Sequence, residues 1–253
     1  MIDAQTISER LASGATHQLA KTRGREIRSL KGVRGVPDGE IARIAAAVYK
    51  EMKPTLEDED ELAELFRTAW EDGIVAVGLV AALGPDHPHD VFDWGLDLLQ
   101  RTDDSATADA LGWLVLGPCM LAARLPVAQV IGVTRRHEHP SVRRAGVMTA
   151  MALTPTPIEG PAAAPLRERM NERRIAFVEQ PQSHAIGAIC TAFLRDEDPS
   201  VRKAMRRVLR AWAACDTTAQ VAWADNTKGG LPKMLRAEID KARKKLARKQ
   251  KDA

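Results

Sequence analysis

The segment His139–Ala145, which reads HPSVRRA, recurs as DPSVRKA at Asp198–Ala204. Each copy is typical of a helix start, because its proline fits the first helical position, and in the second copy Asp198 can accept hydrogen bonds from the free amides of the first turn. Valine and alanine then turn inward, and two basic side chains leave the same turn. The same frame fits upstream at Asp104–Ala110 and, more weakly, at Asp72–Gly78.

A helical motif that occurs four times along the chain predicts stacked helical pairs of the HEAT/armadillo kind. Such pairs stack because one pair cannot bury its apolar face alone. Aromatic residues make up only 4% of the 253 residues, which leaves β-strands poorly supplied with their preferred side chains. We therefore expect an all-α superhelix over residues 1–240, followed by a basic tail at residues 241–253.

The longest interval between two copies of the motif contains a Pro/Ala-rich insertion, Thr154–Pro165. Its four prolines are unfavourable in a helix interior. We expect this insertion to form an exposed loop.

Stacking of the repeats brings equivalent positions onto one face of the superhelix. The sixth position of the frame then forms a column of four side chains, Val77, Asp109, Arg144 and Lys203. One interpretation is an ion-pair ladder between stacked helices, which is a common structural use of such charges. The other is a basic track that receives the phosphates of a polyanion and has one carboxylate facing the ligand.

The net charge of +3 is unevenly distributed. Lys21–Arg34 holds six basic residues against one acidic residue, and Leu231–Ala253 holds nine against three. Basic segments of this kind bind nucleic acid or acidic membranes, although most are solvated helix ends.

Several classes of protein are disfavoured by the sequence. The three cysteines lie far apart, which favours a reducing cytoplasm and argues against disulfides or zinc, and the His87/His89 and His137/His139 pairs lack the spacing of metal ligands. The apolar stretches 73–84 and 110–123 are too short to span a bilayer, and the N-terminus is too polar for a signal peptide. No nucleotide-binding loop or catalytic triad signature is present.

A series of short motifs in fixed order resembles the bacterial DNA alkylation repair glycosylases built from HEAT-like repeats. The motifs are Gly35-Val36 followed by Glu40-Ile41-Ala42-Arg43, Ala69-Trp70-Glu71, Asp109-Ala110-Leu111 with Leu116-Gly117, Val142-Arg143-Arg144-Ala145, and Val201-Arg202-Lys203-Ala204 with Val208-Leu209-Arg210. The resemblance covers approximately residues 25–235.

The resemblance implies an α-solenoid that holds duplex DNA and excises cationic N3- or N7-alkylated purines without a metal or organic cofactor. It places the family's aspartate, which lies near the sugar of the lesion, at Asp109 and the arginine of the next repeat at Arg144. Lys203 and Arg210 fall on the basic positions of the following repeat. The further DNA-binding residues that we expect are Arg143 and Arg207.

This chain departs from the family pattern at its aromatic positions. Ser105 stands where a tryptophan usually precedes the aspartate, Arg207 stands where a second tryptophan is expected, and Glu26 lies near the place of an aromatic before Gly35. Those rings stabilise the cationic lesion through cation–π contacts. Trp113, four residues after Asp109, is a candidate replacement ring, although its apolar surroundings also fit a core tryptophan.

We interpret the chain as a cytoplasmic, monomeric HEAT-like repeat protein that binds double-stranded DNA. If it is an enzyme, the reaction is hydrolysis of the N-glycosidic bond of a cationic alkylpurine. One alternative is a non-catalytic repeat protein that binds nucleic acid. Another, from a different class, is a protein-interaction scaffold, which is a frequent role of such solenoids.

Overall fold

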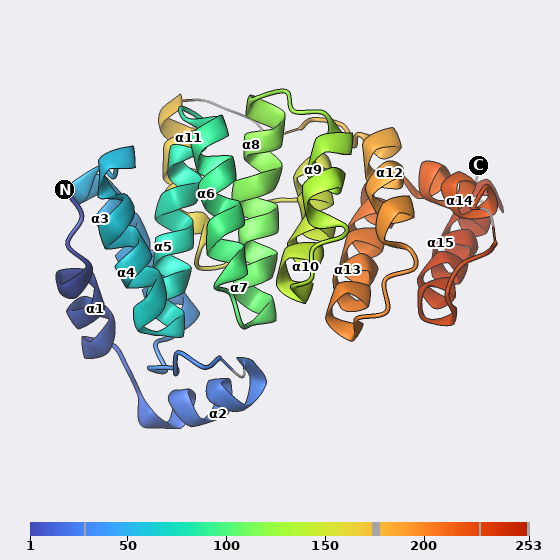
Figure 1. Ribbon diagram of the computed structural model, residues 1–253. Helices are drawn as coiled ribbons and strands as arrows, with labels where there is room; N and C mark the ends of the chain where they lie inside the picture. Colours follow the sequence, from blue (N-terminus) through green and yellow to red (C-terminus); the bar gives the residue numbers. More distant parts are fainter. Residues whose placement is uncertain (28, 174–177, 228, 252–253) are drawn as a thin grey trace.

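The computed structural model describes residues 1–253 except 28, 174–177, 228 and 252–253 (Figure 1). Its helical elements are α1 (Ala4–Ser13), α2 (His17–Ile27), α3 (Asp38–Met52), η1 (Leu56–Asp58), α4 (Glu59–Thr68), α5 (Trp70–Leu83), α6 (Pro88–Gln100), α7 (Ser105–Ala110), η2 (Leu111–Leu116), α8 (Gly117–Ala122), α9 (Val127–Thr134), α10 (Pro140–Met148), η3 (Thr149–Leu153), α11 (Ala163–Arg173), α12 (Ser183–Phe193), α13 (Pro199–Cys215), α14 (Thr217–Asp225) and α15 (Lys233–Lys251).

The helices stack side by side in two layers. In one layer α5 contacts α7 and η2, these contact α10, α10 contacts α13, and α13 contacts α15. The other layer contains α6, α9, α12 and α14, each packed on its neighbours in the first layer. The part of the chain that the structure describes contains helices and no strand, so the predicted all-α superhelix is confirmed. We call the layer from α5 to α15 the inner layer.

The repeated motif marks helix starts in three of its four copies. Asp104 and Asp198 are N-caps whose carboxylates accept from the amides of the next turn, and Pro140 and Pro199 occupy the first position of α10 and α13. The fourth copy is displaced, because α5 begins at Trp70, so Asp72 lies inside its first turn and pairs with Arg34.

The helical run that carries Asp109 changes its winding in the middle. The segment η2 is a π-helix, in which the Gly117 N–H bonds to the Gly112 carbonyl, five residues back. Pro118 has no N–H to offer the Leu114 carbonyl, so the usual ladder is interrupted at this point. A Cβ on Gly112 would lie 2.4 Å from the Ala145 carbonyl oxygen, so glycine permits the close approach of η2 to α10.

The insertion is less exposed than predicted. Residues 155–161 form a loop with exposed and half-buried positions, but residues 162–165 are buried. The helix α11 begins at Ala163, so Pro165 lies in its first turn and needs no N–H. The helix α11 returns to the N-terminal half of the chain and packs on α3 and α5, behind them in Figure 1. A Cβ on Gly78 of α5 would lie 2.6 Å from the Ala162 carbonyl oxygen, which shows how closely this segment approaches.

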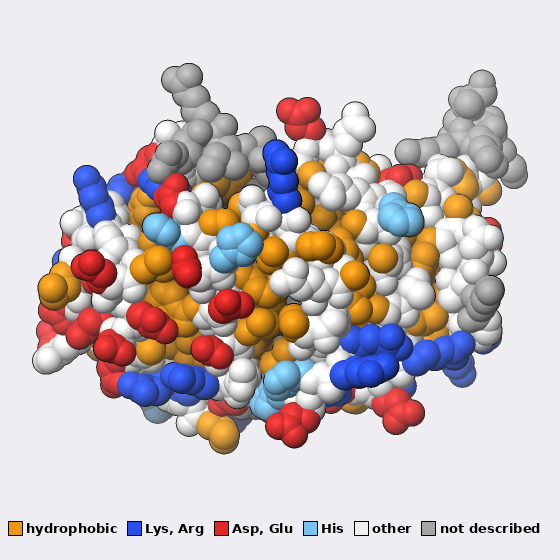
Figure 2. Space-filling model, turned by 45° about the horizontal axis from the view of Figure 1, so that its top comes forward, with side chains coloured by type: hydrophobic (Ala, Val, Ile, Leu, Met, Phe, Trp, Pro, Cys, Tyr) orange, Lys and Arg blue, Asp and Glu red, His pale blue; other side chains and the backbone are white. Residues whose placement is uncertain are grey.

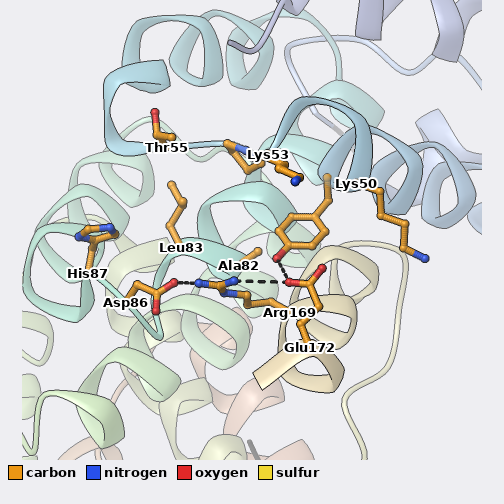
Figure 3. Close-up of a pocket in the computed structure, with 11 residues that line it drawn as sticks. Lys50, Lys53, Thr55, Ala82, Leu83, Asp86, His87, Arg169 and Glu172 are labelled. Carbon is orange, nitrogen blue, oxygen red and sulfur yellow. Dashed lines mark hydrogen bonds and ion pairs between the residues drawn. The ribbon is translucent and has the colours of Figure 1, made fainter. Parts of the chain in front are cut away.

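Polar contacts hold α11 on α3 and on the end of α5. The Tyr49 hydroxyl donates to Glu172 over 2.7 Å, and Lys50 pairs with Glu168 at 2.8 Å. Arg169 lies between Asp86 and Glu172 and pairs with both (Figure 3). The insertion is therefore anchored at its far end.

The predicted boundary at residue 240 lies inside a continuous helix. α15 runs from Lys233 to Lys251, and Ile239 and Ala242, on either side of the boundary, are both buried. The basic residues of the tail therefore belong to a helix that packs on α13 and α14. In the face shown in Figure 2, acidic side chains are frequent over the N-terminal half, and a basic cluster lies at the lower right, over the C-terminal helices.

The helical run Ser105–Ala122 is longer than the apolar stretch predicted from the sequence, and it is long and apolar enough to cross a membrane by length and composition alone. In the structure it is a central helix of the inner layer, and 67% of it is buried inside the fold.

Candidate functional site

Asp109 lies near the end of α7 and is held by the next inner helix. Arg144 of α10 donates from Nε to Oδ1 over 2.7 Å and from Nη2 to Oδ2 over 2.8 Å, and its Nη1 donates to the Ser200 carbonyl. Asp109 is 8% exposed and Arg144 is 4% exposed. Two parallel charge-assisted hydrogen bonds fix the orientation of the carboxylate. The predicted column therefore places Asp109 against Arg144, as in the ion-pair ladder.

Arg207 of α13 is the second cation at Asp109, and it also covers Trp113. Its Nη1 lies 3.2 Å from Asp109 Oδ2, and its Cζ lies 5.1 Å from the centre of the Trp113 ring. Trp113 is 5% exposed, so most of the ring is packed in the core while one part borders the surface. The ring is thus both a core side chain and a wall of the site.

Asp109, Arg207 and Trp113 border a cavity of about 410 Å³. Trp70, at the start of α5, supplies a second indole ring to its wall. The cavity lining includes the carboxylates of Glu26, Asp38, Asp109 and Glu159, and the guanidinium groups of Arg23 and Arg207. Carboxylates with two aromatic rings suit a flat organic cation, because the carboxylates attract its charge and the indole faces carry negative charge density.

The Trp70 ring is covered by an arginine as well. The Arg23 Cζ lies 5.0 Å from the centre of that ring. Trp70 is 6% exposed, and its buried Nε1–H has no hydrogen-bond partner among the described residues. A buried donor without a partner is energetically costly. The Trp70 Nε1–H is such a donor, and its residue lines the cavity.

The connection between α2 and α3 positions one rim of the cavity. The fully buried carboxylate of Glu71 accepts from the backbone N–H groups of Arg34, Gly35 and Val36, at 2.9, 2.8 and 3.2 Å. Gly35 has φ +86°, and a Cβ there would lie 2.3 Å from the Ala20 amide nitrogen. This tether orients α2, whose end brings Glu26 to the cavity.

A second, basic cavity of about 640 Å³ adjoins the first and shares Asp109 and Arg207 with it. Its basic side chains are Arg144, Lys203, Arg206, Arg207 and Arg210. Lys203, Arg207 and Arg210 are exposed at helical spacing on α13, which makes one basic stripe. Ser105, at the position of the family's tryptophan, lines this cavity too.

Glu238 of α15 organises the far end of this stripe. Its carboxylate pairs with Arg210 at 2.7 Å, with Arg206 at 2.9 Å and with Lys241 at 3.6 Å, and its side chain is 3% exposed. The hydrogen bond from Arg210, with that from Arg206, lowers the pKa of Glu238 to about 2. The carboxylate therefore stays ionised and holds these cations together.

Arg143 lies apart from both cavities. Its Nε donates to Asp196 over 2.8 Å, and its Nη1 donates to the carbonyls of His137 and Glu138. Successive side chains on a helix point about 100° apart around the helix axis. Only one of Arg143 and Arg144 can therefore point toward Asp109. Of the predicted site residues, Asp109, Arg144, Lys203, Arg207, Arg210 and Trp113 come together, and Arg143 does not.

The predicted site residues did not include Arg23, Asp38, Trp70 or Glu159, all of which line the first cavity. Trp70 stood within the motif Ala69-Trp70-Glu71, which is the one signal that pointed to this position. Glu159 reaches the cavity through the anchored insertion, which therefore forms part of the cavity wall. Among the described residues no group of three or more His, Cys, Asp or Glu is arranged to hold a metal ion.

The protein is a helical solenoid whose inner layer carries an aspartate, two tryptophans and a basic stripe. A family model described as DNA alkylation repair enzyme matches residues 7–246, so the chain belongs to that family. The fold is similar to a solved structure titled as a predicted DNA alkylation repair enzyme from Enterococcus faecalis, with a TM-score of 0.64, 15% sequence identity, and coverage of 90% of this chain and 95% of that chain. A search among curated proteins gives no match.

Proposed function

We propose that this protein binds duplex DNA on its inner layer and hydrolyses the N-glycosidic bond of cationic alkylated purines. The observation that carries the proposal is the meeting of two cavities at Asp109. One is acidic and bordered by two indole rings, and the other is basic. A DNA backbone along the basic cavity would place a displaced nucleotide beside the acidic one.

The proposed chemistry uses the charge that the lesion already carries. The bond between C1′ and the base nitrogen breaks, and its electron pair leaves with the base, which departs as a neutral molecule. The sugar becomes an oxocarbenium-like cation, water adds to C1′, and the proton of that water passes to Asp109 or to solvent. An ionised Asp109 stabilises the cation that develops on the sugar, and it is already oriented by Arg144 before substrate arrives.

The basic stripe supports binding of the DNA backbone. Lys203 is exposed, and the side chains of Arg207 and Arg210 are 47% and 57% exposed, so these cations can reach phosphate oxygens. Arg144 is buried and holds Asp109, so its proposed role is to position the carboxylate.

The test is release of free 3-methyladenine or 7-methylguanine from methylated duplex DNA. Lys203→Gln is expected to weaken binding of every duplex and to leave the base release from a bound complex largely unchanged. Asp109→Asn is expected to lower release from the bound complex about 100-fold or more. Duplex binding without release of either base would support the non-catalytic alternative.

A further inference from the structure

Both tryptophans that border the acidic cavity are covered by a guanidinium group of the chain itself. The Cζ atoms of Arg23 and Arg207 lie 5.0 and 5.1 Å from the ring centres of Trp70 and Trp113. A guanidinium is a flat, delocalised cation that stacks on aromatic faces and pairs with carboxylates. In the free protein, the two guanidinium groups therefore occupy the positions over the rings that a flat cationic ligand would take.

The two arginines are not held equally. Arg23 donates to the Val36 carbonyl, pairs with Asp38, and lies 3.6 Å from Glu71, with a side chain only 12% exposed. The side chain of Arg207 is 47% exposed, and among the described residues Asp109 is the one ion-pair partner that it has, at 3.2 Å. Arg23 is therefore held in place, whereas the half-exposed Arg207 can leave its position at the cost of one ion pair to Asp109 and its contact with the Trp113 ring.

We propose that the acidic cavity is a binding site for a planar organic cation and that Arg207 occupies the cation position in the free protein. Arg207 covers the Trp113 face and pairs with Asp109, which are the two groups that a flat cationic ring would contact there. A ring that enters must displace Arg207, so this residue sets the affinity and selectivity of the site. This inference deepens the proposed function, because it names a gating residue at the same site.

Arg207 also belongs to the basic stripe with Lys203 and Arg210. A phosphate bound on that stripe would draw the Arg207 guanidinium away from Trp113, because it can accept two parallel hydrogen bonds where Asp109 accepts one from Arg207, at 3.2 Å. Binding of a DNA backbone and opening of the cation site are thereby coupled, and each favours the other.

The experiment measures binding of 1-methylnicotinamide, a permanent planar cation, with neutral nicotinamide as its control, by ligand-observed NMR on the full chain. Arg207→Gln is expected to raise the association constant for the cation about fivefold or more, because the Trp113 face becomes uncovered and Asp109 keeps only Arg144 as a cationic partner. Arg206→Gln is the matched control. It removes one charge from the adjacent position of α13, where the guanidinium pairs with Glu238, and it is expected to change the constant less than twofold.

Adding Trp113→Leu to Arg207→Gln is expected to remove the gain, provided that circular dichroism shows the variant folded; if it does not fold, Asp109→Asn in the Arg207→Gln background serves instead. Equal binding by the Arg206 and Arg207 variants would overturn the proposal, and so would an equal gain for nicotinamide. Cation binding by Arg207→Gln without base release by the wild-type protein would refute the proposed glycosylase function and would still support the proposed cation site. Base release by the wild-type protein without a rise in the association constant in Arg207→Gln would refute only the proposed gating role of Arg207.

Discussion

Asp109 and Arg144, which are 35 positions apart in the chain, form a buried ion pair with two parallel hydrogen bonds of 2.7 and 2.8 Å. The pair joins two successive inner helices where Gly112 allows η2 to approach α10. Desolvation of two charges is expensive, so the pair contributes geometry more than net stability. It holds a carboxylate at the mouth of the acidic cavity in one orientation.

Removal of either partner should leave a buried charge without its counterion. Arg144→Met and Asp109→Asn are each expected to lower the free energy of unfolding by about 3 kcal/mol, and the double variant by clearly less than the sum. Urea unfolding followed by circular dichroism measures all three. Additive losses would show that the two side chains do not depend on each other.

The exposed basic stripe should control the dependence of DNA affinity on salt. Lys203→Gln is expected to lower the slope of log affinity against log salt by about 0.9, independently of sequence, because one phosphate contact disappears. Arg143→Gln removes the same charge from a side chain tied to Asp196 and should leave that slope unchanged while it destabilises the fold. Fluorescence anisotropy at several salt concentrations measures the slope for each variant. Equal slopes for Lys203→Gln and Arg143→Gln would argue against the basic stripe as the surface that binds DNA.

Glu238 should restrain the cations around it. Glu238→Gln is expected to raise affinity for duplex DNA, because Arg206, Arg210 and Lys241 lose a carboxylate that competes with phosphate. Unchanged or weaker binding by this variant, measured by anisotropy at fixed salt, would contradict this role.

The same carboxylate should leave a signature in acid. Because the folded protein holds the pKa of Glu238 at about 2, below its ordinary value of 4.5, its stabilisation is complete above pH 4.5 and is lost as the pH falls toward 2. Its size is about 2 kcal/mol after allowance for the solvent around the arginines. Glu238→Gln should therefore flatten the acid limb of a stability profile, and an identical acid limb in both proteins would exclude the effect.

Tyr49 reports directly on the docking of α11, because it is the single tyrosine of the chain. Burial, together with the hydrogen bond to Glu172, raises its pKa to about 12. Absorbance at 295 nm should show this titration near pH 12 in the folded protein and near 10 after denaturation. Stability from this group is present below pH 10 and falls as the pH rises toward 12. A folded-state transition near pH 10 would mean that α11 does not cover the ring.

Features that the repeated motif encodes were accessible from the sequence, including the alignment of Asp109 with Arg144, whereas contacts outside the repeat were not. Asp104 and Asp198 cap helices through amides two or three residues away, so a short motif predicts them. That Trp70 and Trp113 border the same cavity depends on how α5 packs against η2, and the approach of Glu159 depends on α11 crossing back to α3 and α5. No local pattern encodes either contact. The placement of Arg143 failed for a related reason, because two adjacent arginines satisfy the same motif while the helix can direct only one inward.

Asp109 is the group that we propose acts on the sugar, and base release from methylated duplex DNA tests this role most directly. Asp109→Asn should lower release of 3-methyladenine and 7-methylguanine about 100-fold or more, at a temperature where circular dichroism shows the variant folded, while DNA affinity holds or rises. Asp196→Asn, which removes a carboxylate from the neighbouring Arg143 pair, is the matched control and should lower release less than threefold. Equal release by wild-type protein and Asp109→Asn would contradict the account.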